Sequence, residues 1–505
     1  MNLSAGLGLL ALIAAPAAMA QDAAHGGVMP ATTGQPPVDC AYLTAGSVGN
    51  AAAMLRTACE REAASSHAVI RWASTDDVEA YSAAHPAGLP ILLKDNIETR
   101  DMPTTAGSLA LVNNAPGRDA PLVTRLRDAG YLVMGKTNLS EWANIRSSNS
   151  ISGWSAVGGL TPNSYDPTRT ACGSSSGSAV AVAVGLAPAA IGTETDGSIT
   201  CPASVNGIVG FKPTVGLVSR THIVPISHSQ DTAGPMTTTV EDAAIVLSVI
   251  AGSDPADPAT VEADAHKVDY RAALNAEALN GARIGVMRFQ KGYSVETMAV
   301  FEQNLQALRD AGAVLIDIND GPDGETIGNA ELTVLLYELK ADLNAYLAST
   351  DPTQVKTRTL ADLIAFNKAT PQETVLFGQE LFEQAQGKGD LTTPEYIDAR
   401  VTSLRLAGPE GIDRMMAAND VVALIAPTTS RAWTNNRDDD DDAQGFTSEL
   451  AAVAGYPHLT VPMGFDRGMP VGLSFIGGQW DDAAILSLGY AFEQKTHARR
   501  PPPAR

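Results

Sequence analysis

The sequence predicts an α/β protein: one large domain in which helices cover a mostly parallel or mixed central β-sheet. Two observations carry this prediction. Helical segments alternate along the chain with short apolar segments of strand length, which is the pattern of α/β folds. No Pro- or Ser-rich linker divides the chain after residue 40, although 505 residues are enough for several domains. One domain is therefore expected.

The first elements are expected between residues 45 and 134. Helical periodicity runs through residues 45–73 and predicts a helix there. The apolar run from Leu89 to Leu93 has the length of a buried strand, which ends at Lys94. The segment 121–134 then predicts a helix, a stop at a glycine and a further strand.

The second half of the chain continues the alternation. Residues 305–318, "LQALRDAGAVLIDI", predict another helix, glycine stop and strand, by local helix-stop chemistry and without a global repeat. Residues 325–420 are mainly helical and are expected to cover one face of the sheet. Three apolar segments return to strands at residues 421–429, 458–465 and 471–478.

The first twenty residues predict a cleaved secretory signal peptide. Their apolar stretch, Leu3 to Ile13, is too short to span a bilayer comfortably, and Ala18-Met19-Ala20 supplies a small-x-small cleavage pattern before Gln21. We therefore expect an exported protein, periplasmic or secreted, with no stable membrane association; a retained anchor is the alternative. Residues 21–40 form a flexible leader and residues 41–505 the main domain.

Export permits disulfides among four cysteines. Cys40 and Cys59 are close in sequence, so a bond between them would clip the N-terminal segment. The pairing of Cys172 and Cys201 stays open. None of the four has metal-ligand spacing, so neither zinc nor any other cofactor is expected.

The formal net charge of −22 disfavours nucleic acid and anionic membranes as partners, because both would be repelled. Part of that charge is the run Asp438 to Asp442. Such a run is typical of a solvated loop, and the spacing of an EF-hand calcium loop is missing. A small-molecule or peptide substrate fits this composition better than a nucleic acid does.

The segment 171–185, "ACGSSSGSAVAVAVG", is rich in serine. A nucleophile elbow with Ser175 as nucleophile needs an apolar strand directly before it, but "PNSYDPTRTAC" precedes it here. A phosphate-binding P-loop needs a closing Gly-Lys-Ser/Thr, which is also missing. Taken alone, the segment fits a small-residue turn.

Two further segments change this interpretation: "GLPILLKDNIETRDMPTTAGS" at residues 88–108, and "AIGTETDGSITCPASVNGIVGFKPTVGLVS" at residues 190–219. Together with the serine-rich segment they resemble the amidase signature family of serine hydrolases, in the family's order. The resemblance runs from about residue 45 to about residue 500. It implies the family's fold, a large domain with a central mixed sheet covered by helices.

The resemblance also implies the catalytic residues. Ser198 matches the family nucleophile, Ser174 the bridging serine held by a cis peptide bond, and Lys94 the base, which leaves Ser175 and Ser176 as loop residues. An alcohol needs a base within hydrogen-bond reach. A lysine can be that base only where burial or nearby positive charge lowers its pKa. The apolar run before Lys94 provides such burial.

The turn at the nucleophile is expected to bind the substrate carbonyl. The resemblance implies that the oxyanion hole is formed by backbone N–H groups, those of Thr195, Asp196, Gly197 and Ser198. Many members read Gly-Gly-Ser-Ile-Arg here, whereas this chain has Asp196 for the first glycine and Thr200 for the arginine. Both differences favour a neutral amide with N–H donors over an anionic substrate. Asp196 and Thr200 are therefore candidate substrate-binding residues.

Within the family, residues 192–236 resemble those of peptide amidases. That resemblance implies hydrolysis of a peptide's C-terminal carboxamide to acid and ammonia, sparing internal peptide bonds. A broad amidase, aryl acylamidase or esterase with the same triad is the alternative. Signal peptide and α/β content alone would also allow a periplasmic binding protein.

Other candidate catalytic residues are given structural roles. Lys136 is interpreted as a snorkelling surface lysine, which the family treats as structural. The matching motifs contain no catalytic histidine, so His222, His228 and His458 are not expected to act in catalysis.

Overall fold

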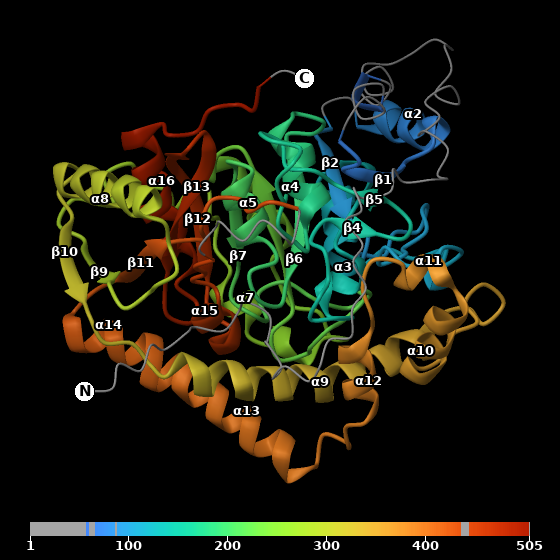
Figure 1. The fold of residues 1–505 in the computed structure, drawn as a ribbon. Coiled ribbons are helices and arrows are strands. Elements are labelled where there is room, and N and C mark those ends of the chain that lie inside the picture. Colours follow the sequence, from blue (N-terminus) through green and yellow to red (C-terminus); the bar gives the residue numbers. More distant parts are fainter. Residues whose placement is uncertain (1–56, 60–65, 86–87, 436–443, 504–505) are drawn as a thin grey trace.

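The computed structural model describes residues 57–59, 66–85, 88–435 and 444–503 (Figure 1). The predicted signal peptide and leader, Cys40 and the run Asp438 to Asp442 lie outside these residues. No helix among the described residues is long and apolar enough to cross a membrane.

The described residues form a mixed sheet of 11 strands in the order β1-β3-β2-β6-β8-β7-β12-β13-β11-β9-β10. The β2 strand pairs in parallel with β3 and β6, β9 pairs in parallel with β10 and β11, and the remaining pairs are antiparallel. The predicted α/β fold with a mixed sheet is confirmed. The strands are β1 Val69–Trp72, β2 Pro90–Lys94, β3 Leu132–Thr137, β6 Ala189–Glu194, β7 Val209–Lys212, β8 Thr232–Thr237, β9 Arg283–Met287, β10 Val314–Ile318, β11 Ala423–Pro427, β12 His458–Asp466 and β13 Met469–Ile476, with β4 Trp154–Ser155 and β5 Gly159–Leu160 in a separate hairpin.

Two groups of helices pack on this sheet. In one group α3, α6, α16 and α8 contact one another in that order, and α4 contacts α5 in the other. The helices of the chain are α2 Thr75–Ala84, α3 Pro121–Asp128, α4 Ser176–Ala183, α5 Thr200–Val205, α6 Val240–Ile250, α7 Ala263–His266, α8 Val295–Asp310, α9 Gly324–Ser349, α10 Leu360–Ala369, α11 Pro371–Thr374, α12 Glu380–Gln386, α13 Pro394–Ala407, α14 Arg414–Asn419, α15 Glu449–Ala454 and α16 Asp482–Thr496.

The segment 325–420 is mainly helical as expected, but only part of it covers the sheet. Helix α9 packs mainly against α10, α12 and α13, and runs along the lower side of the view in Figure 1. Its apolar stripe, which includes Leu336, Leu343 and Leu347, belongs to a cluster with Leu363 and Phe382 that is separate from the core of the sheet. The other end of the segment does pack on the sheet, because Ile412 and Met415 share an apolar cluster with Met287 of β9 and Leu424 of β11.

The helix expected over residues 45–73 is wrong at its C-terminal end. Residues Val69–Trp72 form β1, which pairs antiparallel with β3. Val69 and Trp72 are buried there. Sheet pairing and β-branched residues outweigh the helical periodicity of the preceding alanine-rich stretch.

Three strand ends position the site. The parallel strands β2 and β6 end at Lys94 and Glu194, so both residues lie at the same edge of the sheet. The antiparallel strand β8 begins at this edge, where Thr232 pairs with Glu194. Residues from segments far apart in sequence therefore meet at one place.

Candidate active site

Lys94 ends β2 with a fully buried side chain. Its Nζ donates hydrogen bonds to Ser174 Oγ at 2.7 Å, to Thr193 Oγ1 at 2.9 Å and to Thr193 O at 3.0 Å. Burial lowers the pKa of Lys94 to about 7, opposed by the negative charges of Asp231 and Glu194. A substantial fraction of Lys94 is therefore neutral near pH 7 and can accept a proton.

Ser174 lies in the loop before α4, and the Gly173–Ser174 peptide bond is cis. A Cβ at position 173 would collide with Ser140 Oγ, so a larger residue there would displace the Ser140 side chain. The neighbouring serines serve the loop itself. Ser175 Oγ donates to Thr193 O at 3.0 Å, and Ser176 Oγ donates to Cys172 O at 2.5 Å. This agrees with the interpretation of Ser175 and Ser176 as loop residues.

Ser198 lies in the turn between β6 and α5 and is 7% exposed. Its carbonyl oxygen accepts a hydrogen bond of 3.1 Å from Ser175 N–H, which brings the turn against the loop of Ser174. Gly197, just before Ser198, has a φ of +73°, a conformation that strains other residues. A disulfide between Cys172 and Cys201 further joins the two segments.

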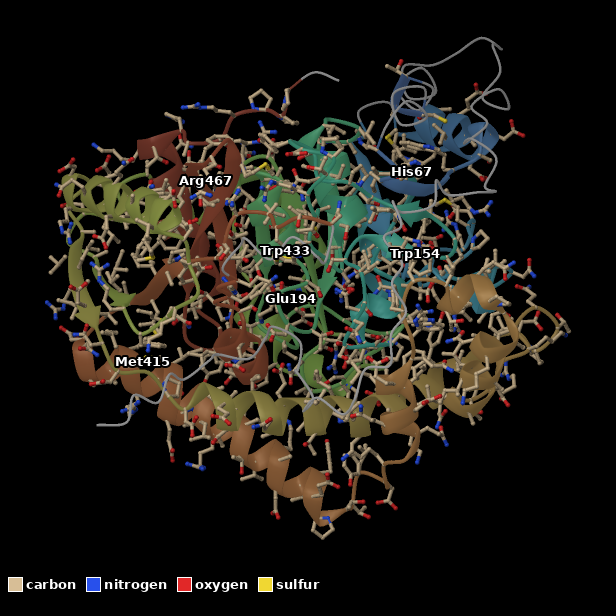
Figure 2. All side chains as sticks on the ribbon, in the orientation of Figure 1. His67, Trp154, Glu194, Met415, Trp433 and Arg467 are labelled. Carbon is tan, nitrogen blue, oxygen red and sulfur yellow. A yellow bond between two sulfur atoms is a disulfide. The ribbon has the colours of Figure 1, made fainter. Side chains whose placement is uncertain are left out.

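Glu194 braces the turn that carries Ser198, a role that the motifs did not indicate. Its Oε2 accepts hydrogen bonds from Ile199 N–H at 2.7 Å and from Thr200 N–H at 2.9 Å. Within the described residues, the N–H groups of 195–198 donate no hydrogen bond. Four adjacent donors thus remain available to an oxyanion. Figure 2 shows Glu194 well inside the molecule. The available signal was an acidic residue ending an apolar strand four positions before Ser198.

The two candidate substrate-binding residues have different surroundings. Both carboxylate oxygens of Asp196 are buried without a partner at hydrogen-bond geometry among the described residues, although Ser448 lies near enough to lower its pKa. Burial dominates and raises the pKa of Asp196 to about 7. The Thr200 hydroxyl instead contacts Glu194 Oε2 at 3.3 Å, which favours a bracing role.

Two further carboxyl groups lie in the electrostatic neighbourhood of Asp196 and were not identified from the sequence. They are Glu331 of α9 and Glu449 of α15. Burial raises the pKa of Glu449 to about 8 and that of Glu331 well above its usual range, and the charge of Asp196 adds to both shifts. These positions are distant in sequence, so only the fold places the three carboxyl groups together.

Lys136 is not a surface lysine, contrary to the sequence prediction. Its side chain is fully buried, and Nζ lies 3.0 Å from Asp95 Oδ1 and 2.8 Å from Thr104 Oγ1. This strand position faces the interior, so snorkelling is impossible. The ion pair with Asp95 agrees with the other part of the prediction, that Lys136 has a structural role. The described residues place no carboxylate at ion-pair distance from Lys94, which distinguishes the two lysines.

None of the three histidines hydrogen-bonds to Ser198 within the described structure. His458 is buried, its Nε2 lies 2.6 Å from Ser474 Oγ, and burial lowers its pKa to about 3. His228 lies at the protein surface, where its Nδ1 is 2.9 Å from Asp342 Oδ2. These contacts give both residues structural partners.

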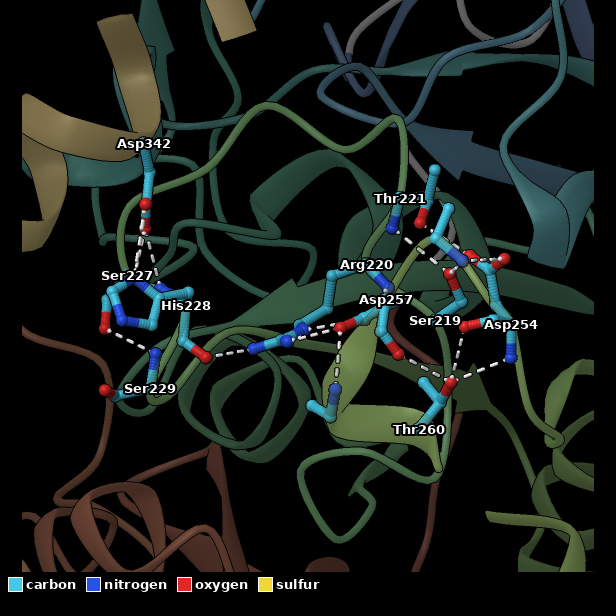
Figure 3. Close-up of polar contacts among 12 residues, drawn as sticks. Ser219, Arg220, Thr221, Ser227, His228, Ser229, Asp254, Asp257, Thr260 and Asp342 are labelled. Atoms are coloured by element: carbon cyan, nitrogen blue, oxygen red, sulfur yellow. Dashed lines mark hydrogen bonds and ion pairs between the residues drawn. The ribbon is translucent and has the colours of Figure 1, made fainter. Parts of the chain in front are cut away.

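A cavity of about 380 Å³ adjoins the site. Thr193 and Thr195 line it on the side of β6, and parts of the segment 220–232 and of α9 line it elsewhere. The cavity therefore lies beside Thr195, the first residue of the turn whose N–H groups donate no hydrogen bond within the described residues. Its polar wall around Arg220 and His228 is shown in Figure 3.

A buried lysine of lowered pKa contacts a serine here, beside a turn whose N–H groups donate no hydrogen bond within the described residues, and this arrangement fits a serine hydrolase. Residues 50–486 match the family model described as amidase. The chain therefore belongs to the amidase family and is an amide-hydrolysing enzyme, not a binding protein.

The chain is also similar to individual proteins of this family. The crystal structure of native peptide amidase from Stenotrophomonas maltophilia is 49% identical, covers 89% of this chain and 94% of that chain, and superposes with a TM-score of 0.84. The crystal structure of an amidase family protein from Bacillus anthracis is 33% identical, covers 89% of this chain and 88% of that chain, and superposes with a TM-score of 0.79. A probable amidase of Arabidopsis thaliana is 37% identical over 82% of this chain and 78% of its own length.

Proposed function

We propose that the enzyme hydrolyses the C-terminal carboxamide of peptides to the free acid and ammonia, through an acyl-enzyme on Ser198. The observation that carries the mechanism is the 2.7 Å contact between Lys94 Nζ and Ser174 Oγ, beside the turn of Ser198. The similarity to a peptide amidase supports the substrate class. Amide hydrolysis follows from the family, and the part proposed here is that the substrate is the C-terminal amide of a peptide.

In the first step Ser198 Oγ attacks the carboxamide carbon. The new C–O bond forms while the carbonyl electron pair moves onto oxygen. The proton of Ser198 passes to Ser174, whose own proton passes to neutral Lys94. The N–H groups of 195–198 donate to the resulting oxyanion.

In the second step the carbon–nitrogen bond breaks. The proton on Lys94 returns through Ser174 to the leaving nitrogen, which departs as ammonia. Water then attacks the ester carbon of the acyl-enzyme and gives a proton through Ser174 to Lys94. The bond between that carbon and Ser198 Oγ breaks, and the proton returns from Lys94 through Ser174 to Ser198 Oγ. The products are the free acid and the original enzyme.

Asp196 supports a preference for a substrate that carries an N–H group. Its two buried oxygens lack partners in the described structure, and a buried acceptor without a partner costs about 1–3 kcal/mol. A hydrogen bond from a substrate N–H would satisfy one oxygen and orient the carbonyl toward the N–H groups of the turn. Such a contact disfavours substrates without that donor.

The alternative is a broad amidase, aryl acylamidase or esterase that uses the same triad. The deciding experiment incubates the enzyme with an N-acetylated dipeptide amide, the matching free acid, an aryl anilide and a fatty amide. We expect ammonia and free acid from the peptide amide, and no cleavage of the internal peptide bond. Faster turnover of the anilide or the fatty amide would contradict the substrate assignment.

We also propose that the protein is exported. The disulfide between Cys172 and Cys201 supports this, because structural disulfides persist in oxidising compartments. N-terminal sequencing of the protein recovered from its native host should begin at Gln21. A mature chain in the cytoplasm that still begins at Met1 would contradict export.

A further inference from the structure

Asp231 lies where the segment 226–231 meets the nucleophile turn. Its Oδ1 accepts a hydrogen bond of 2.6 Å from the Thr195 hydroxyl. Its Oδ2 accepts hydrogen bonds from the N–H groups of Ile226 at 2.8 Å and Ser227 at 3.0 Å. One carboxylate therefore ties the first residue of the candidate oxyanion turn to a separate segment of the chain.

Residues of helix α9 accept hydrogen bonds from the segment 226–231. Glu338 accepts hydrogen bonds from the hydroxyls of Ser227 and Ser229, both at 2.5 Å. Gln230 Nε2 donates to Glu331 Oε1 at 2.7 Å and reaches Thr195 O at 3.4 Å. Helix α9 therefore holds the residues next to Asp231, and the N–H groups of Ile226 and Ser227 in that segment in turn hold its carboxylate.

The charge of Asp231 also acts on the base. Asp231 lines the same cavity as Thr193, whose hydroxyl accepts a hydrogen bond of 2.9 Å from Lys94 Nζ. The negative charges of Asp231 and Glu194 oppose the lowering of the pKa of Lys94 by burial. Burial raises the pKa of Asp231 to about 6, and the charge of Arg220, which lines the same cavity, opposes this shift. Figure 3 shows Arg220 held by Asp257, to whose two oxygens it donates at 2.5 Å and 2.9 Å.

We propose that Asp231 is a positioning residue for the amide hydrolysis, which fixes Thr195 in the oxyanion turn and supplies negative charge opposite Lys94. The proposal rests on the proposed function, because it concerns the Ser198–Ser174–Lys94 relay. It assigns two separable effects to one carboxylate. The hydrogen bond sets the geometry of the turn, and the charge sets the pH at which Lys94 loses its proton.

The test measures kcat/KM against pH for an N-acetylated dipeptide amide, in folded wild type and three variants. Asp231→Asn removes the charge, so the pKa of Lys94 should fall. The rise of activity with pH should then move to lower pH by roughly one unit, with a loss of about 10- to 100-fold at the plateau. Thr195→Val removes the hydroxyl that lowers the pKa of Asp231 but leaves the carboxyl group in place, so it should lower kcat and move the rise less than Asp231→Asn does.

Asp254→Asn is the matched control. Asp254 accepts hydrogen bonds from Ser219 at 2.6 Å and Thr221 at 2.5 Å in the same part of the structure (Figure 3), but it contacts neither Thr195 nor Lys94. This variant should keep both the plateau and the position of the rise.

A folded Asp231→Asn protein whose rise coincides with that of the wild type would overturn the charge effect. If that variant does not fold, Asp231→Glu keeps the charge with a longer side chain, and a wild-type kcat in it would overturn the positioning effect. A Lys94→Ala enzyme with near-normal turnover would instead overturn the proposed function. The two failures are therefore distinguishable.

Discussion

The side-chain nitrogen of Lys94 lies 2.7 Å from the hydroxyl oxygen of Ser174, and both residues are fully buried. On the neighbouring strand β3, the equally buried Lys136 has an ion pair with Asp95 at 3.0 Å. Burial lowers the pKa of both lysines, but a contacting carboxylate favours the charged form of Lys136. The lysine that contacts a serine is suited to act as a base, and the one that contacts an aspartate is suited to hold the fold.

Activity should rise with pH through about 7, because the relay needs Lys94 neutral and its pKa is lowered to about 7 by burial. Lys94→Ala should lose several orders of magnitude in kcat/KM while remaining folded. The measurement is a pH profile of ammonia release for both proteins. A rise centred near the ordinary lysine pKa, or near-normal turnover in the variant, would contradict the role of Lys94.

Lys136→Met should destabilise the fold by roughly 3–5 kcal/mol, because it leaves the carboxylate of Asp95 buried without its cation. Chemical denaturation of the variant and the wild type measures this difference. The folded fraction of the variant should keep the pH at which activity rises. A variant as stable as the wild type would show that the ion pair contributes nothing.

Asp196→Asn should slow hydrolysis of a peptide amide by about 10- to 100-fold, because a buried acceptor for the substrate N–H is altered. The matching methyl ester lacks the leaving NH₂ group and should be affected less. Steady-state kinetics on both substrates measures the difference. Equal losses on amide and ester would show that Asp196 only braces the turn.

Replacing Cys172 and Cys201 together by alanine should lower the free energy of unfolding by about 3 kcal/mol, since the bond closes a loop with a sequence separation of 29. Activity should fall as well, because the bond joins the segments of Ser174 and Ser198. Thermal unfolding and kcat of the double variant check this. Unchanged values for both would contradict the role of the disulfide.

Much of the fold follows from local pattern in the sequence. The apolar runs that became β2, β11, β12 and β13 were predicted because buried strands in a mixed sheet are continuously apolar. The placement of α9 was not predicted, because helices α12 and α13, against which it packs, lie further along the chain and beyond the reach of local pattern. Periodicity identifies an apolar face and does not identify what covers it.

Some residues of the candidate site could also be predicted from the sequence, whereas others could not. Ser174, Ser198 and Lys94 are predicted as site residues because their motifs resemble those of a known family, and the structure brings Lys94 and Ser174 into contact. Glu194 and Asp231 were missed, since a carboxylate that accepts backbone or hydroxyl hydrogen bonds has no sequence motif. Such contacts depend on strands that meet only in the folded sheet.

Covalent labelling of the nucleophilic serine tests the central claim, the assignment of Ser198, most directly. The wild type is treated with a fluorophosphonate, digested, and the modified peptide is mapped by mass spectrometry, with Ser198→Ala and Ser175→Ala treated in parallel. The account predicts one adduct on Ser198, retained in Ser175→Ala and lost in Ser198→Ala. An adduct on Ser175, or labelling that persists without Ser198, would contradict it.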